Sequence, residues 1–278
     1  MRGKLLIIGG NEDKSGHEQE FSESNILKRF IDESRKGNKS KIEIITAAAS
    51  IPEEVAEDYL EAFGKLKAKN VGVMIMQNRE EADHPDILER LRNADAVFVT
   101  GGDQLRLTSV LGGSKFYQIL KEKLNEPDFI YAGTSAGAAA ASESMVLNGT
   151  SEEAPYKGKV HTSTGFAFVE DVIFDTHFIS RGRIGRLFEI IVSNPKILGV
   201  GLEENTALLV HRNKMEAVGP GCLIIIDGQH IIQSNLNDVE EGAPLSIENM
   251  VLHLMSEHDI FDLKTRKLKI INPPEEEI

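Results

Sequence analysis

The chain has 278 residues, 41% of them hydrophobic, which is enough to bury a substantial core in one large domain. It carries 44 Asp and Glu against 31 Lys and Arg, and the net charge of −13 repels nucleic acids and anionic membrane surfaces. The single cysteine, Cys222, excludes an internal disulfide framework and a multi-cysteine metal site. No apolar run approaches the roughly 20 residues that span a bilayer, and Leu5–Ile8 is too short for a signal-peptide core. We therefore expect a cytoplasmic protein.

In the first half of the chain, short apolar runs rich in β-branched residues alternate with longer amphipathic runs. This alternation is typical of βαβ units and predicts a parallel sheet. The expected strands are Leu5–Ile8, Ile42–Thr46, Val71–Met76, Ala94–Thr100 and Phe129–Ala132, and the expected helices are Glu23–Arg35 and Pro52–Lys69. The loops that follow such strands meet at the carboxyl edge of the sheet, where open parallel sheets bind ligands.

The pattern changes in the second half, where Gly149–Gly165 is polar and irregular. The apolar runs Val172–Phe174 and Leu198–Leu202 flank a predicted helix over Arg183–Val192. Three short apolar runs then predict antiparallel hairpins, at Ala207–Val210, Met215–Val218 and Leu223–Ile226. We expect this half to extend the same sheet. Residues 1–272 would then form a single α/β domain with a mostly parallel, doubly wound sheet, followed by an acidic tail at 273–278.

The segment Gly133-Thr134-Ser135-Ala136-Gly137 has the form of a nucleophile elbow, in which a strand turns sharply into a helix. Small residues on both sides allow the strained turn and expose the hydroxyl of Ser135. The following helix, predicted over Ala136–Ala141, points free N–H groups and its positive dipole end at that hydroxyl. Ser135 is therefore the candidate nucleophile, although a tight turn with a structural serine would have the same five residues.

A serine hydroxyl needs a base within hydrogen-bond reach, and that base needs a third group to orient it. His177 follows the strand Val172–Phe174 directly, so it is the candidate base. Glu203 and Glu204 follow the strand Leu198–Leu202 and are both candidates for the third group. Each of these side chains could equally be an ordinary surface group.

Two glycine pairs also follow strands. Gly101-Gly102-Asp103-Gln104 lets bare backbone N–H groups approach a ligand, so the amides of Gly102 and Ala136 are candidates for an oxyanion hole. A phosphate-binding turn and a simple strand–helix turn are the alternatives there. Gly9-Gly10 suggests a nucleotide site, but the chain has neither G-x-G-x-x-G spacing at this point nor a phosphate-binding G-x-x-x-x-G-K-[ST] motif.

Three arginines lie close together in this acidic chain, in Arg181-Gly182-Arg183-Ile184-Gly185-Arg186. Guanidinium groups pair bidentately with carboxylates, and these three are near the candidate base in sequence. They favour a substrate that carries several carboxylates or a carboxylate terminus. Salt bridges to the many surface acids are the alternative.

Taken together, these motifs resemble those of the cyanophycinases, serine peptidases with a class I glutamine-amidotransferase-like, flavodoxin-like α/β fold. The order and spacing of the matching segments extend over most of the chain. The matching segments are Gly101–Gln104, Gly133–Ala138, Asp175 with His177-Phe178, Arg181–Arg183 with Gly185–Leu187, and Gly201–Ala207. A glutamine amidotransferase itself is disfavoured, because its elbow needs a cysteine where this chain has Ser135.

The resemblance implies hydrolysis of cyanophycin, a polyaspartate whose side chains carry arginine, to β-aspartyl-arginine dipeptides. It implies a triad of Ser135, His177 and Glu204, no cofactor or metal, and a homodimer. It also implies a substrate pocket that contains Gln104, Asp175, Arg181, Arg183 and Arg186.

The chain departs from the family at Thr176, where cyanophycinases usually have glutamine. A threonine is shorter and offers no amide donor and acceptor at that reach. The substrate preference can differ as a result. An aspartyl dipeptidase acting on small acidic peptides and a non-catalytic peptide-binding protein of the same fold are the alternatives.

Overall fold

A computed structural model of the chain describes residues 2–15, 25–149 and 155–271. Its largest sheet has nine strands, five of them parallel and four antiparallel. The parallel part is, in spatial order, β3 (Asn70–Met74), β2 (Lys41–Ile45), β4 (Ala96–Val99), β5 (Ile130–Thr134) and β1 (Lys4–Ile8). The antiparallel part continues from β1 with β10 (Ala207–His211), β11 (Lys214–Val218), β16 (Ile260–Asp262) and β17 (Lys267–Lys269). The predicted parallel sheet is confirmed, with strand boundaries that differ from the predicted ones by at most two residues.

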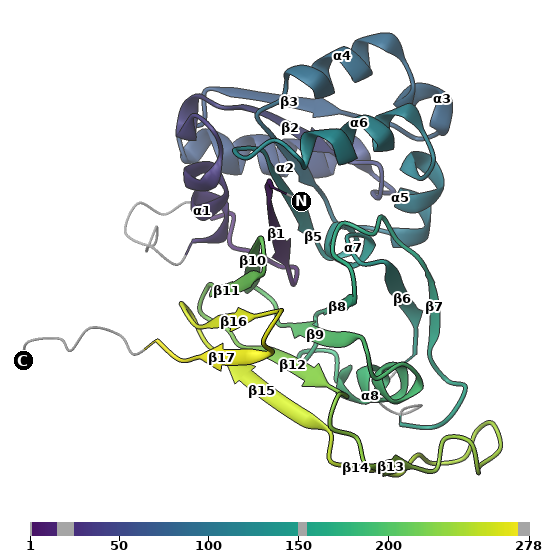
Figure 1. The fold of residues 1–278 in the computed structure, drawn as a ribbon. Coiled ribbons are helices and arrows are strands. Elements are labelled where there is room, and N and C mark those ends of the chain that lie inside the picture. Colours follow the sequence, from purple (N-terminus) through teal and green to yellow (C-terminus); the bar gives the residue numbers. More distant parts are fainter. Residues whose placement is uncertain (1, 16–24, 150–154, 272–278) are drawn as a thin grey trace, which may run out of the picture.

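A second sheet of four strands lies beside the first and corrects the expectation that the second half would only extend one sheet (Figure 1). Its order is β15 (Val251–Met255), β12 (Leu223–Asp227), β9 (Leu198–Leu202) and β8 (Val172–Thr176). The physical reason is that β10 pairs antiparallel with β1 and so occupies the edge that β8 and β9 would need. Moreover, β8 is buried on both faces, because Phe174 packs into the core shared with the first sheet and Ile173 packs on the side of α8 (Ile184–Ser193).

The predicted hairpins are confirmed only in part. Strands β10 and β11 form an antiparallel hairpin, but β12 pairs with β9 and β15 instead of continuing the series. A further strand, β7 (His161–Thr164), pairs with β6 (Ser144–Asn148) where irregular chain was expected. A short pair of strands, β13 (Gln233–Ser234) and β14 (Ile247–Glu248), completes the pairing. The predicted acidic tail at 273–278 lies outside the described residues.

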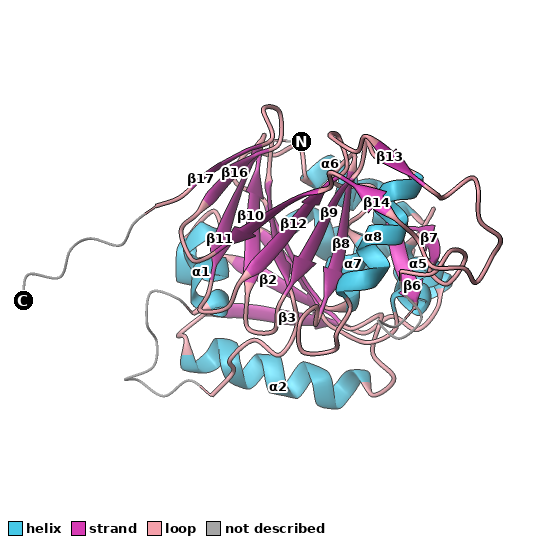
Figure 2. Cartoon of the chain, turned by 90° about the horizontal axis from the view of Figure 1, so that it is seen from below, coloured by secondary structure: helices cyan, strands magenta, loops and turns pink. Residues whose placement is uncertain are grey.

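Helices cover both faces of the first sheet. On one face, α1 (Ile26–Glu33) and α2 (Pro52–Lys65) bury an aromatic group of Phe30, Phe63 and Phe98 against the strands; Figure 2 shows α2 on the outside of the sheet. The opposite face packs against the remaining helices and the second sheet. The remaining helices are α3 (Arg79–Ala82), α4 (Pro85–Asn93), α5 (Gln104–Leu111), α6 (Lys115–Lys123) and α7 (Ala136–Ala140), with one turn of 3₁₀ helix at Gly37–Lys39.

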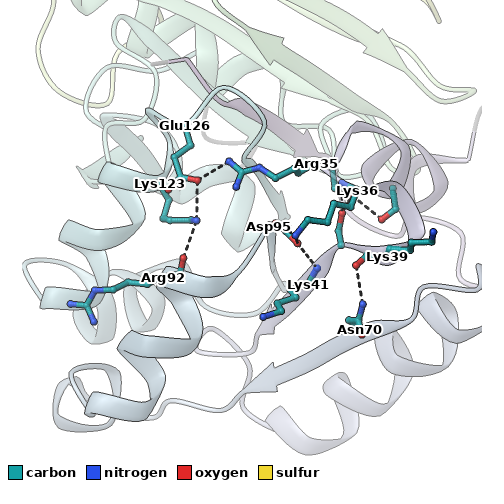
Figure 3. Close-up of polar contacts among 12 residues, drawn as sticks. Arg35, Lys36, Lys39, Lys41, Asn70, Arg92, Asp95, Lys123 and Glu126 are labelled. Carbon is teal, nitrogen blue, oxygen red and sulfur yellow. Dashed lines mark hydrogen bonds and ion pairs between the residues drawn. The ribbon is translucent and has the colours of Figure 1, made fainter.

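Polar side chains close the amino edge of the parallel strands (Figure 3). Asp95, just before β4, accepts hydrogen bonds from Lys36 Nζ at 3.0 Å and from the backbone N–H of Lys41 at 2.9 Å. Burial opposes ionisation, but these two donors lower the pKa of Asp95 below its ordinary value. Lys123 Nζ similarly contacts Glu126 at 3.1 Å. Both acids at this edge, Asp95 and Glu126, are thus paired with cations.

Candidate active site

The predicted elbow has the backbone geometry that its sequence indicates. Ser135 lies between β5 and α7 with φ 50° and ψ −104°, a conformation that an L-residue adopts only under strain. A Cβ at Gly133 would lie 2.5 Å from backbone atoms of Gly137, and a Cβ at Gly137 would lie 2.6 Å from the carbonyl oxygen of Val99. Larger residues at either glycine would therefore force the turn apart, so both glycines are needed to hold Ser135 at the sheet edge.

The structure brings Ser135, His177 and Glu204 together. His177 Nε2 lies 3.1 Å from Ser135 Oγ, and His177 Nδ1 lies 2.6 Å from Glu204 Oε1. The serine follows β5 of the first sheet, whereas the histidine and the glutamate follow the paired strands β8 and β9 of the second. The three groups stand in the order nucleophile, base and orienting carboxylate, which is the geometry of a serine-peptidase triad.

Glu204 is held ionised by its neighbours. A hydrogen bond from the side chain of Asn11 and a second one from His177 lower the pKa of Glu204 below its ordinary value. An ionised carboxylate only accepts hydrogen bonds, so His177 carries a proton on Nδ1. In a neutral imidazole with this tautomer, Nε2 has a free lone pair facing Ser135, as a general base requires.

The structure separates the two glutamates that the sequence left as alternatives. Glu203 Oε2 accepts hydrogen bonds from the backbone N–H groups of Ile179 at 2.6 Å and Ser180 at 3.0 Å. It thereby holds the turn that follows the histidine, while Glu204 faces His177 itself. Because successive residues at a strand end point in different directions, the pair serves two purposes.

The turn after β1 is a part of the site that sequence reasoning missed. A Cβ at Gly10 would lie 2.4 Å from His177 Cε1, and Gly10 has φ +104°, so only glycine allows the imidazole to pack there. The sequence suggested a nucleotide site at Gly9-Gly10 as a minor alternative. The signal in the sequence was the position of this glycine pair directly after the first strand. In the structure, Ile8 of β1 is in register with Thr134 of β5, so the turn after β1 lies beside Ser135.

The two candidate oxyanion-hole residues border one small cavity. Gly102 and Ala136 line it together with Ser135, and its volume is about 100 Å³. Gly102 has φ +142°, and a Cβ there would lie 2.1 Å from the carbonyl oxygen of Ala48, so a glycine is required. Among the described residues, the backbone N–H groups of Gly102 and Ala136 have no acceptor. Both are therefore available to a substrate oxyanion.

The arginines differ in what they contact. Arg186 is buried and donates from Nε and Nη2 to Asp175, and from Nη1 to the carbonyl oxygen of Gly149 at 3.0 Å. Arg183 is half-buried and donates from Nη1 to the carbonyl oxygen of Thr176 at 2.7 Å. Arg181 is exposed. All three arginines line the cavity, but Arg183 and Arg181 have more guanidinium donors left to offer than Arg186 has.

The remaining predicted pocket residues also line the cavity. Gln104 donates from Nε2 to the carbonyl oxygen of Val146, in β6, at 3.0 Å. This hydrogen bond fixes the Gln104 amide in the cavity lining. Thr176 is 5% exposed, so a larger side chain there would have to enter the cavity. A larger hollow of about 630 Å³ lies at the amino ends of β8 and β9, is lined by charges of both signs, and includes none of the triad residues.

Within the described ranges, no helix is long and apolar enough to cross a membrane. No group of three or more His, Cys, Asp and Glu side chains in those ranges is arranged to hold a metal ion.

Comparison with known proteins gives a family. The family model described as Peptidase family S51 matches residues 5–218. The chain belongs to this family. It is a serine-type peptidase, a hydrolase. The cyanophycinase of Geminocystis herdmanii (strain PCC 6308) is 32% identical over 268 residues, which cover 96% of this chain and 96% of that protein. The cyanophycinase of Trichormus variabilis (strain ATCC 29413 / PCC 7937) is 34% identical over 264 residues, 94% of this chain and 86% of that protein.

A solved structure supports the family S51 fold. A peptidase from an acI-B1 Actinobacterium superposes with a TM-score of 0.61 at 20% identity, covering 90% of this chain and 97% of that chain. The resemblance to cyanophycinases that the sequence motifs indicated is thus confirmed at the level of the family and of the α/β fold.

Proposed function

We propose that this family S51 peptidase is a cyanophycinase-like exopeptidase that hydrolyses cyanophycin to β-aspartyl-arginine dipeptides. The observation that carries the proposal is the continuous contact from Ser135 Oγ through His177 to Glu204, at 3.1 Å and 2.6 Å, beside two free amides. The relatives of similar length that carry the name cyanophycinase supply the substrate class.

In the proposed mechanism, Ser135 Oγ attacks the carbonyl carbon of the scissile peptide bond while its proton passes to His177 Nε2. The amides of Gly102 and Ala136 hold the oxyanion of the tetrahedral intermediate. His177 then protonates the departing amine, the C–N bond breaks, and an acyl-enzyme remains. A water molecule repeats the sequence, so the second product leaves as a carboxylate and the serine regains its proton.

In this proposal the arginines of the cavity recognise the substrate. We assign substrate carboxylates to Arg183 and Arg181, because Arg186 is already paired with Asp175. Asp175 and Arg186 then form the wall of the pocket, and Gln104 and Thr176 supply its neutral polar groups. Arginines lining the pocket of a protein of net charge −13 favour binding of the free carboxylates of the substrate.

One observation favours a second candidate. The cavity measures about 100 Å³, and Thr176 replaces the glutamine expected in it, so a small acidic dipeptide is the alternative substrate. We further propose a cytoplasmic location, consistent with one half-exposed cysteine, and a homodimer that binds neither nucleic acid nor membrane. Light scattering of the purified protein tests the homodimer.

The test is incubation with purified cyanophycin, with the products separated by chromatography and identified by mass. Release of β-aspartyl-arginine by the wild type and not by Ser135→Ala supports the proposal. Cleavage of small aspartyl dipeptides with an untouched polymer would favour the second candidate. If a serine-directed fluorophosphonate labels neither the wild type nor Ser135→Ala, the result would favour a non-catalytic binding protein of the same fold.

A further inference from the structure

Glu12 is a buried carboxylate that the proposed mechanism does not use. It follows the turn Gly9-Gly10-Asn11, and only 4% of it is exposed. One carboxylate oxygen accepts the hydroxyl of Tyr59, and the other accepts Thr134 Oγ1 at 2.7 Å. Among the described residues no cation forms an ion pair with it. Burying a carboxylate without a cation costs stability relative to burying an apolar residue. The presence of Glu12 at this position therefore needs a functional explanation.

The partners of Glu12 are fixed as donors. Burial, and then the charge of Glu12, raise the pKa of Tyr59 well above its ordinary value, so its phenol keeps its proton. Thr134 immediately precedes the nucleophile, and Tyr59 belongs to α2 on the outer face of the sheet. Glu12 thus joins the turn after β1 both to the elbow and to a rigid helix.

That turn contacts the nucleophile and the base. The backbone N–H of Ser135 donates to the carbonyl oxygen of Ile8 at 3.0 Å, and the backbone N–H of His177 donates to that of Gly9 at 3.0 Å. The imidazole itself packs where a Cβ of Gly10 would be. A shift of the turn would therefore displace the base relative to the serine.

The same turn contacts the third member. Asn205, next to the orienting glutamate, donates its backbone N–H to the carbonyl oxygen of Gly10 at 2.8 Å and accepts from Asp13 N at 3.0 Å. The side chain of Asn11 hydrogen-bonds Glu204 directly. The last residue of β1, Ile8, and the turn Gly9-Gly10-Asn11 after it therefore contact all three members of a triad whose serine and histidine come from different sheets.

We propose that Glu12 is a positioning residue: its carboxylate, bound by Tyr59 and Thr134, fixes the turn that sets the distance between Ser135 and His177. The inference rests on the proposed function, because it assumes that Ser135 is activated by His177. Positioning errors of about 1 Å can cost 10²-fold in rate, so the effect is measurable.

The experiment measures the rate at which a fluorophosphonate acylates Ser135, which requires no knowledge of the substrate. Thr134→Val and Tyr59→Phe each remove one donor from Glu12, and Glu12→Gln removes its charge. We expect each to slow acylation about 10–100-fold. Thr134→Ser keeps the hydroxyl and is expected to restore the wild-type rate.

The control for a general loss of stability is Asp259→Asn, since Asp259 is an equally buried carboxylate, 2% exposed, at the antiparallel end of the first sheet. It is expected to lower the unfolding midpoint and leave the acylation rate unchanged. Wild-type acylation in folded Thr134→Val and Tyr59→Phe would overturn the inference alone. A wild type that is never acylated would overturn the proposed function, and the inference with it.

Discussion

Arg186 and Asp175 form a buried bidentate ion pair in the wall of the cavity. Two guanidinium nitrogens contact the carboxylate, the third contacts Gly149, and Asp175 is 2% exposed. Arg183, three residues earlier, donates one hydrogen bond, to the carbonyl oxygen of Thr176, and its Nη1 lies 3.8 Å from the Asp175 carboxylate. Two arginines that look equivalent in sequence thus have different tasks, and their substitutions should separate stability from substrate binding.

For Arg186→Lys we expect a loss of stability. An ammonium cannot contact both oxygens of Asp175, and a lost hydrogen bond between charged groups costs roughly 1.5–3 kcal/mol. Denaturant unfolding measures the difference. If stability is unchanged and KM rises instead, Arg186 acts on the substrate.

For Arg183→Lys we expect a pH-dependent KM. Burial, and then the nearby charge of Arg186, lower the pKa of Arg183 to about 10, so the wild-type cation persists at neutral pH. A lysine ammonium has a lower ordinary pKa than a guanidinium, about 10.4, and the same burial and the same charge of Arg186 would lower it further. A cation binds carboxylates below its pKa and not above it. KM of the variant should therefore begin to rise at a lower pH than KM of the wild type; KM profiles that coincide contradict the assignment.

The triad substitutions should differ in severity. Ser135→Ala and His177→Ala are expected to lower kcat by similar factors, on the order of 10⁵–10⁶, because triad members act as a unit. Glu204→Gln should be milder, since the orienting acid matters less than the base. Steady-state kinetics on the same substrate, with circular dichroism to check folding, provide the comparison. A His177→Ala variant as active as the wild type would assign the base elsewhere.

Gly10→Ala should lose activity out of proportion to stability. The added Cβ would lie 2.4 Å from the imidazole of His177, which must move. Gly37→Ala is the matched control, because Gly37 also has a positive φ, +53°, but nothing within 4 Å of a new Cβ. Both variants should lose about 1–2 kcal/mol from backbone strain, and only the first should lose kcat. Equal kcat in the two would show that His177 tolerates displacement.

Thr176→Gln tests the motif position at which cyanophycinases usually have glutamine. A buried polar group left without its partner costs about 1–3 kcal/mol, so the wild type should bind the arginine-bearing polymer more weakly than the variant does. The panel is cyanophycin and β-aspartyl dipeptides with different second residues. Efficient cleavage of cyanophycin by the wild type, with no gain in the variant, would show that threonine in place of glutamine at position 176 does not affect substrate binding.

The first half of the fold was predictable because its strands are short, apolar and β-branched, and β2, β4 and β5 fall within the expected segments or a few residues of them. Helix α2 ends at Lys65 and not at Lys69, because Lys67 has φ +61°, which ends a helix whatever the hydrophobic pattern. The second sheet was not predictable, since β8 and β9 are apolar on both faces and their pattern does not say which sheet they join.

The candidate site was predictable as far as each residue follows its own strand. Ser135, His177 and Glu204 all do, and the structure brings them within hydrogen-bond distance, while their catalytic roles stay predictions. The turn around Gly10 and Glu12 was not predictable, because most of its contacts join residues separated by more than 100 positions, and Glu12 and Tyr59 are 47 positions apart. No local pattern encodes such contacts.

The placement of the serine on one sheet and of its base on the other has a consequence for synthesis at the ribosome. When β5 and α7 have emerged, the nascent chain holds Ser135 without a base, since His177 and Glu204 are added 42 and 69 residues later by position in the chain. An isolated serine hydroxyl is a weak nucleophile. We therefore expect the unfinished enzyme to be unreactive toward neighbouring polypeptides until β8 and β9 have been synthesised and have packed against the first sheet.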